Sequence, residues 1–149
     1  MSMDGFIGEY NHTIDTKGRV IIPLRFREEL GEKFYLSKGL DGCLWIHPME
    51  EWQQFRASLR ELSAIDEDSR LFKRFFLSGA TECELDKQGR ILIPGPLRTY
   101  AKLIKDVVVT GLDNRIEVWS QENWDVMNDL DPAAMNKVAA RLSSMGIKI

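Results

Sequence analysis

The segment His12-Thr-Ile-Asp-Thr-Lys-Gly-Arg-Val-Ile-Ile-Pro23 occurs again, 71 residues later, as Cys83-Glu-Leu-Asp-Lys-Gln-Gly-Arg-Ile-Leu-Ile-Pro94. The Asp, Gly, Arg and Pro positions are identical in the two copies, and apolar residues occupy the same places between them. This match indicates an internal duplication, a feature that decides the whole fold when it is present.

The duplication extends beyond this segment. Lys38-Gly-Leu-Asp41 matches Thr110-Gly-Leu-Asp113, and the pair Glu50 and Trp52 matches Glu122 and Trp124. We therefore divide the chain into repeat 1 (residues 6–52), connecting helices (53–77), repeat 2 (78–124) and a C-terminal helical tail (125–149). Each repeat is too small to bury a good core alone, so we expect the two to interleave their strands and share one.

Each motif predicts two strands joined by a tight turn, because glycine readily supplies the positive φ that hairpin turns require. In repeat 1 we predict strands at 7–14, 19–22, 34–37 and 43–47, and helices at 24–30 and 48–59. In repeat 2 we predict strands at 79–85, 90–93, 107–110 and 116–119, and helices at 96–103 and after Ser120, a plausible N-cap. Further helices are predicted at 66–77 and 131–142, followed by a frayed end at 143–149.

These elements predict an α+β fold with a mainly β core and short flanking helices. Hydrophobic residues make up 44% of the chain and charged residues 29%, as in ordinary globular domains. We assign the large aromatic side chains to core packing rather than to base stacking or cofactor binding: Trp45, Trp52, Trp119, Trp124, Phe34, Phe55, Phe75 and Phe76.

The composition also indicates the cellular compartment of the protein. No apolar run approaches the roughly 20 residues that span a bilayer, and no secretory signal pattern is present. Two cysteines, Cys43 and Cys83, give no disulfide framework, so we expect a reduced, cytoplasmic setting. Met1 to Gly5 resembles a tag remnant or an alternative start and is left out of the fold prediction.

The charge of the chain is acidic overall but basic near the first motif. The net charge is −3 and the pI is about 5.5, so binding to nucleic acid would need a local basic patch. Between residues 11 and 27 the only acid is Asp15, against Lys17, Arg19, Arg25 and Arg27. The second motif has Lys87 and Arg90, with Arg98, Lys102 and Lys105 nearby, but Glu82 and Glu84 precede it.

The motif itself can hold an arginine side chain in one orientation, in which it can contact DNA. Asp15 and Arg19 face each other across the turn and can pair, which would orient a guanidinium suited to a phosphate or a guanine edge. Asp86 and Arg90 repeat this pair. As DNA contacts we rank Arg19 and Lys17 above Arg90 and Lys87. We expect Arg25 to add positive charge beside them. The alternative is an exposed local ion pair, worth about 0–1 kcal/mol and without function.

The opening Gly8-Glu-Tyr-Asn-His-Thr-Ile-Asp-Thr-Lys-Gly-Arg19 and the paired Asp-x-x-x-Arg motifs resemble the MraZ family over most of the chain, from about Phe6 to Leu130. The resemblance implies a duplicated AbrB-like swapped-hairpin β-barrel and a ring-shaped homo-oligomer in the cytoplasm or on the nucleoid. It also implies a sequence-specific regulator, with repression expected. Its operator would be direct repeats of double-stranded DNA at the promoter of the division and cell-wall gene cluster, which includes its own gene.

Two other classes of function fit the sequence less well. An enzyme would need a catalytic constellation, and His12, His47, Cys43 and Cys83 lack the spacing of zinc ligands. The segment Gly39 to Gly42 lacks the Lys and Ser/Thr of a phosphate-binding loop. We therefore predict no enzymatic activity, no metal, no cofactor, no small-molecule substrate and no membrane partner. The remaining alternative is a ring-forming scaffold or antitoxin-like protein that touches DNA little.

Overall fold

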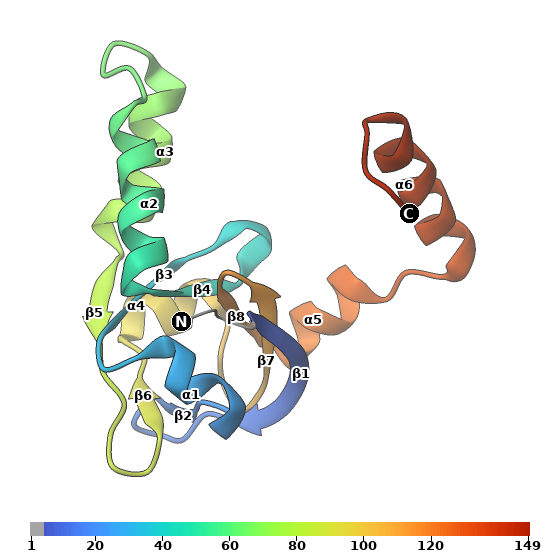
Figure 1. Ribbon diagram of the computed structural model, residues 1–149. Helices are drawn as coiled ribbons and strands as arrows, with labels where there is room; N and C mark the ends of the chain where they lie inside the picture. Colours follow the sequence, from blue (N-terminus) through green and yellow to red (C-terminus); the bar gives the residue numbers. More distant parts are fainter. Residues whose placement is uncertain (1–4) are drawn as a thin grey trace.

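The computed structural model describes residues 5–149, and this range contains eight strands and six α-helices (Figure 1). Most of the segment left out of the fold prediction, residues 1–4, lies outside the described residues. The strands are β1 (Phe6–Thr13), β2 (Arg19–Ile21), β3 (Phe34–Lys38), β4 (Leu44–Pro48), β5 (Thr81–Cys83), β6 (Arg90–Leu92), β7 (Asp106–Asp113) and β8 (Ile116–Ser120). The helices are α1 (Leu24–Leu30), α2 (Met49–Arg60), α3 (Glu67–Ser78), α4 (Gly95–Ala101), α5 (Gln121–Asn128) and α6 (Pro132–Ser144), with a 3-10 turn at Leu40–Gly42.

The strands of the two repeats exchange partners, as the small size of each repeat predicted. The main sheet is antiparallel, with the order β1-β7-β8-β4-β3-β5. Strand β1 of repeat 1 pairs with β7 of repeat 2, and β5 of repeat 2 pairs with β3 of repeat 1. Strands β2 and β6, which follow the two motif turns, pair with each other as a separate two-stranded ribbon. The two repeats therefore form one body.

The pairing in residues 5–149 does not form the closed barrel that the family resemblance implied. The six-stranded sheet has two open edges, β1 and β5. A single bridge joins Val20 of the β2–β6 ribbon to Ile14, the residue that follows β1. The coarser prediction, an α+β fold with a mainly β core, is confirmed.

The core lies on both faces of the main sheet. On β7, Val107 and Val109 face a large cluster that α1 and α4 help to enclose, whereas Val108 faces a second cluster beneath α2 and α3. This alternation follows from the period of two in a strand. The aromatic prediction is largely confirmed, because Trp45, Trp52, Trp119, Phe34 and Phe76 are buried, while Trp124, Phe55 and Phe75 are partly buried.

Strand β5 is shorter than the predicted strand at 79–85. Helix α3 continues to Ser78, and Gly79 keeps a helical backbone (φ −97°, ψ −3°), so the strand begins only at Thr81. Its pairing then ends after three residues, opposite Phe34 to Leu36 of β3. The other predicted elements lie within a few residues of the observed ones.

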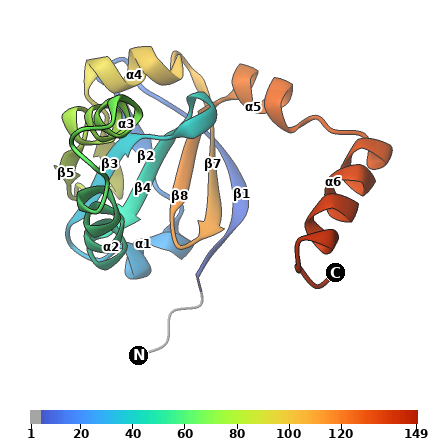
Figure 2. The ribbon, with the colours of Figure 1, turned by 90° about the horizontal axis from the view of Figure 1, so that it is seen from above.

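The last two helices form an arm that leads away from the main sheet (Figure 2). The predicted N-cap of α5 is confirmed, because the Ser120 hydroxyl accepts a hydrogen bond from the backbone N–H of Asn123. Asp131 caps α6 in the same way through Ala134. Several large apolar side chains on and after α6 remain exposed: Met135, Leu142, Met145, Ile147 and Ile149.

Candidate nucleic-acid interface

The first motif forms a turn that is organised around the carboxylate of Asp15. Its Oδ1 accepts hydrogen bonds from the backbone N–H groups of Lys17 (3.0 Å) and Arg19 (2.9 Å). Its Oδ2 accepts a third, from Arg19 Nε at 2.7 Å. Gly18 has φ of 88°, which glycine adopts without strain. The predicted pair therefore exists, and it holds the Arg19 side chain, one-third exposed, in one orientation.

The second motif has the same geometry. Asp86 Oδ1 accepts from the backbone N–H groups of Gln88 and Arg90, both at 2.9 Å, and Oδ2 accepts from Arg90 Nε at 2.9 Å. Gly89 takes the positive φ, 77°. We call these hydrogen bonds to the aspartate carboxylate the aspartate brace. The brace follows from the repeated sequence, because all of its hydrogen bonds join residues of one five-residue segment.

The hydrogen bonds to Asp15 lower the pKa of its carboxyl to about 2, with the backbone N–H of Arg19 the largest cause and the Arg19 side chain also contributing. The same donors, now from Arg90, lower the pKa of Asp86. Since these groups stabilise the ionised form, both carboxylates stay charged at neutral pH.

We expect the Asp15 carboxyl to titrate near pH 2 in an NMR pH titration of the folded protein. Because the folded-state pKa lies below the ordinary 3.8, the brace is complete at any pH above that value and is lost as the pH falls towards 2. Replacing Arg19 with Met removes the side-chain donor and should raise the midpoint. An Asp15 midpoint that is already near 3.8 in the unsubstituted protein would show that the turn lacks this brace in solution.

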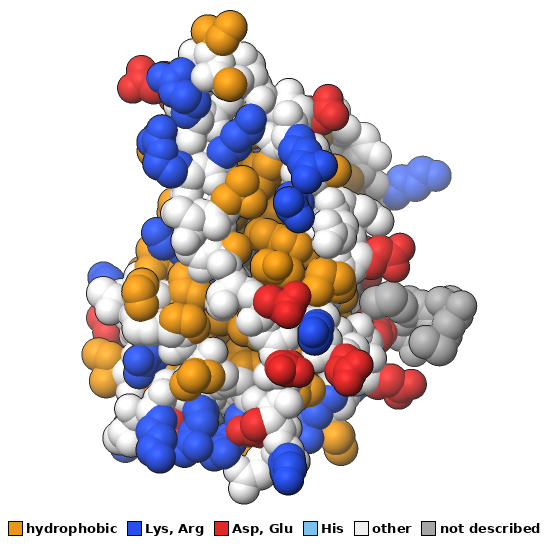
Figure 3. Space-filling model, turned by 90° about the vertical axis from the view of Figure 1, so that its left-hand side faces the viewer, with side chains coloured by type: hydrophobic (Ala, Val, Ile, Leu, Met, Phe, Trp, Pro, Cys, Tyr) orange, Lys and Arg blue, Asp and Glu red, His pale blue; other side chains and the backbone are white. Residues whose placement is uncertain are grey.

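The β2–β6 ribbon brings the two turns to one end of the molecule. The register pairs Arg19 with Leu92 and Ile21 with Arg90. Two further bonds join each turn to the other repeat, from Ile22 N–H to the Gly89 carbonyl (2.9 Å) and from Ile93 N–H to the Gly18 carbonyl (2.8 Å). Arg90 Nη1 also lies 4.0 Å from Asp15 Oδ2. Lys and Arg side chains gather at this end of the molecule (Figure 3). Basic residues that are about 70 positions apart therefore share one surface.

Each turn is also covered by an arginine from the opposite repeat. Arg27 of α1 packs over Gly89, where an added Cβ would overlap its guanidinium, and its Nε donates to the Ile22 carbonyl at 2.8 Å. Arg98 of α4 packs over Gly18, where a Cβ would lie 2.9 Å from its Cζ. The sequence indicates only local positive charge at these two positions and does not predict their contacts across the repeats. The signal was available, because each lies four residues after the proline that ends its motif.

Comparison with known proteins agrees with the duplication. A profile of the family described as "MraZ protein, putative antitoxin-like" matches residues 6–75 and again residues 76–143.

The chain belongs to the MraZ family.

Among its relatives are proteins named "Transcriptional regulator MraZ" from Thermoanaerobacter sp. (strain X514), Clostridium tetani and Moorella thermoacetica. The first two are each 52% identical to this chain and cover 95% of it and 99% of their own length. The third is 60% identical over 80% of this chain and 84% of its own. These names describe MraZ proteins as regulators of transcription, which agrees with the prediction that this chain is not an enzyme.

The other predicted contact residues of this MraZ-family chain have different surroundings. Lys17 and Lys87 are exposed at the two turns. Arg25 is exposed as well, but it lines a small hollow with Ile7 and Glu29 rather than contacting a turn. Strand β1 separates Ile7 from the turn that follows Ile14, so the structure does not bring Arg25 together with Lys17 and Arg19.

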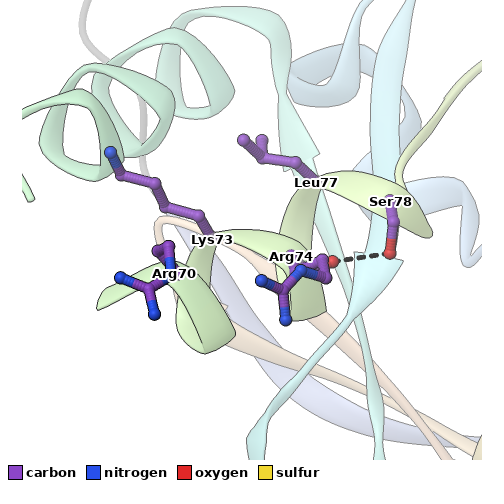
Figure 4. A pocket seen from close by; sticks show the side chains of 5 residues that line it. All are labelled: Arg70, Lys73, Arg74, Leu77 and Ser78. Carbon is purple, nitrogen blue, oxygen red and sulfur yellow. Dashed lines mark hydrogen bonds between the residues drawn. The ribbon is translucent and has the colours of Figure 1, made fainter. Parts of the chain in front are cut away.

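A second group of cations lies on α3 (Figure 4), which is at the opposite end of the molecule from the β2–β6 ribbon (Figure 1). Arg70, Lys73 and Arg74 line a hollow there with Leu77 and Ser78. Arg70 donates to two carbonyls of the α2–α3 loop and Lys73 donates to a third. These two cations therefore stabilise the helical hairpin.

No helix within residues 5–149 is long and apolar enough to cross a membrane.

Proposed function

We propose that this chain is a DNA-binding regulator of transcription that presents the aspartate-braced arginines of its two turns to double-stranded DNA. The observation that carries the proposal is the convergence of Lys17, Arg19, Lys87 and Arg90 at the β2–β6 ribbon, in a chain whose net charge is −3. Such a local excess of cations is what attraction to phosphate requires. The braced guanidinium of Arg19 can add a bidentate contact to a base edge.

The family resemblance supports a more specific version of this proposal. The regulator binds direct repeats in the promoter of the division and cell-wall gene cluster and represses it, its own gene included. It works in the cytoplasm, on the nucleoid. The exchange of strands between repeats supports the swapped-hairpin arrangement of this family, which we retain as a proposal.

The test is a fluorescence anisotropy titration with the DNA upstream of the protein's own operon and with scrambled DNA of equal length. We expect a clear preference for the upstream DNA and a linear fall of log K with log salt concentration, steep because several phosphates are contacted. Equal affinity for both DNAs would overturn the proposal. It would favour the scaffold or antitoxin-like alternative, which the description of the family profile supports.

We also propose that the chain assembles into a ring-shaped homo-oligomer. The supporting observation is the α5–α6 arm, which leads away from the main sheet. Its apolar side chains stay exposed, because no other part of residues 5–149 packs over them. An arm that packs against a different surface of the next copy makes a head-to-tail contact, and such contacts generate rings when the rotation closes. Several copies on one ring could then bind adjacent repeats together, which raises avidity by about 10²–10⁴.

Replacing Leu142 with Glu should reduce the mass of the assembly in analytical ultracentrifugation, because a charge would enter the apolar face of α6. Asn136→Glu, on an exposed position of the same helix, is the matched control and should leave the mass unchanged. If both variants keep the mass of the unsubstituted protein, the arm is not the contact between copies.

A further inference from the structure

A hollow of about 510 Å³ lies beside α4, close to the first turn. Its walls contain two cations, Arg98 and Lys102, and one acid, Glu122. Glu122 forms no ion pair within 4.0 Å with either cation in the described residues, although its carboxylate lowers the net charge of the hollow. The other lining residues are Gly95, Thr99, Leu103 and Ile104.

Arg98 connects this hollow to the turn that carries Lys17 and Arg19. Its guanidinium lies against Gly18, where an added Cβ would be 2.9 Å from Nη1 and 3.0 Å from Nε. Gly18 is buried as a result. The Arg98 Nε is also buried, yet it has no hydrogen-bond partner among the described residues. A buried N–H without an acceptor is costly. No hydrogen bond from Nε therefore fixes the guanidinium of this half-buried arginine, and its fork can turn towards a ligand in the hollow.

The equivalent arginine of the other repeat shows what a purely structural role looks like. Arg27 lies four residues after Pro23, as Arg98 does after Pro94, and it covers Gly89 in the same way. Its Nε, however, donates to the Ile22 carbonyl at 2.8 Å. The two positions therefore differ at Nε, which has an acceptor in Arg27 and none in Arg98, and Arg98 also lines a hollow with a second cation, Lys102.

We propose that Arg98 and Lys102 bind a phosphate group of the DNA backbone next to the first turn. This inference rests on the proposed function. The planar guanidinium fork of an arginine fits phosphate oxygens, and Lys102 supplies a second positive charge four residues along the chain. Repeat 2 thereby contributes a phosphate contact to the DNA-binding turn of repeat 1.

Arg98→Gln should make the dependence of log K on log salt concentration shallower by about 0.9 for each protomer bound, the slope of one lost phosphate contact. Affinity should fall by a similar factor on upstream and scrambled DNA, because phosphate contacts carry no sequence information. Arg98→Lys should keep the slope. Arg74→Gln, which removes one exposed cation from α3 far from the turns, is the control, and we expect it to leave the slope unchanged.

The outcomes are distinguishable. If the unsubstituted protein does not prefer upstream DNA, the proposed function fails. If it does, but Arg98→Gln leaves the salt slope unchanged, only the present inference is overturned. Should Arg98→Gln fail to fold, the Nε–H signal of Arg98 in the unsubstituted protein replaces it, and we expect that signal to shift when DNA is added. A signal that shifts with inorganic phosphate and not with DNA would assign the hollow to free phosphate and overturn the DNA contact.

Discussion

Replacing Arg19 with Ala should abolish the preference for upstream over scrambled DNA while leaving the protein folded. A good bidentate contact to a base is worth about 1–3 kcal/mol of discrimination, and an assembly that binds several repeats loses it at every copy, so we expect at least a ~100-fold loss of preference. The fold should survive because the Arg19 side chain is one-third exposed and its ion pair lies at the surface. Anisotropy titrations measure the preference, and thermal melts measure the fold.

Two further variants make this result specific. Arg74→Ala removes one exposed positive charge from α3, far from the turns, and should leave the preference intact. Arg90→Ala should reduce it by a smaller factor, because the Arg90 side chain is less exposed than that of Arg19 and also lies beside Asp15. A preference that survives Arg19→Ala would mean that the first turn does not read DNA.

The largest expected loss of stability comes from a buried carboxylate far from the turns. Glu117 on β8 is 8% exposed and accepts hydrogen bonds from the indole N–H groups of Trp45 (3.1 Å) and Trp119 (3.0 Å). Its third donor is Arg115, at 3.3 Å, whose guanidinium also lies 4.2 Å from the centre of the Trp45 ring. Both indole N–H groups and the Nη2 of Arg115 are thus paired through this one side chain.

Glu117→Ala should lower the free energy of unfolding by about 3–5 kcal/mol, as expected when one partner of a buried ion pair is removed. The two indole N–H groups would lose their acceptor, and Arg115 would lose its counter-charge. For a chain of this size each kcal/mol corresponds to roughly 2–4 °C, so the melting temperature should fall by roughly 6–20 °C. Calorimetry measures the melt, and tryptophan fluorescence reports the change around Trp45 and Trp119.

A conservative variant separates charge from hydrogen bonding. Glu117→Gln keeps a carbonyl acceptor for one indole and should cost less than Glu117→Ala. Glu84→Ala removes an exposed carboxylate and should change the melt little. If Glu117→Ala has the same melting temperature as the unsubstituted protein, the network contributes nothing to the stability of the fold.

The sequence predicted the elements and the two turns well because these depend on neighbouring residues. Asp15 and Arg19 are four positions apart, and one carboxylate closes the whole turn, so the same five-residue pattern gives the same geometry twice. The cap at Ser120 is local in the same sense. The exception, strand β5, was predicted too long because the end of α3 competes with it for residues 79 and 80.

By itself, then, the sequence determined the duplication, the α+β class, the braced arginines and the family. Only the tertiary structure decided how the repeats exchange strands, that Arg27 and Arg98 cross to the opposite turns, and that Glu117 pairs with an indole 72 residues away. The physical reason is the range of the contacts. A hydrogen bond within one turn follows from a few adjacent residues, whereas the partner of a side chain across the sheet depends on the register that the whole core selects.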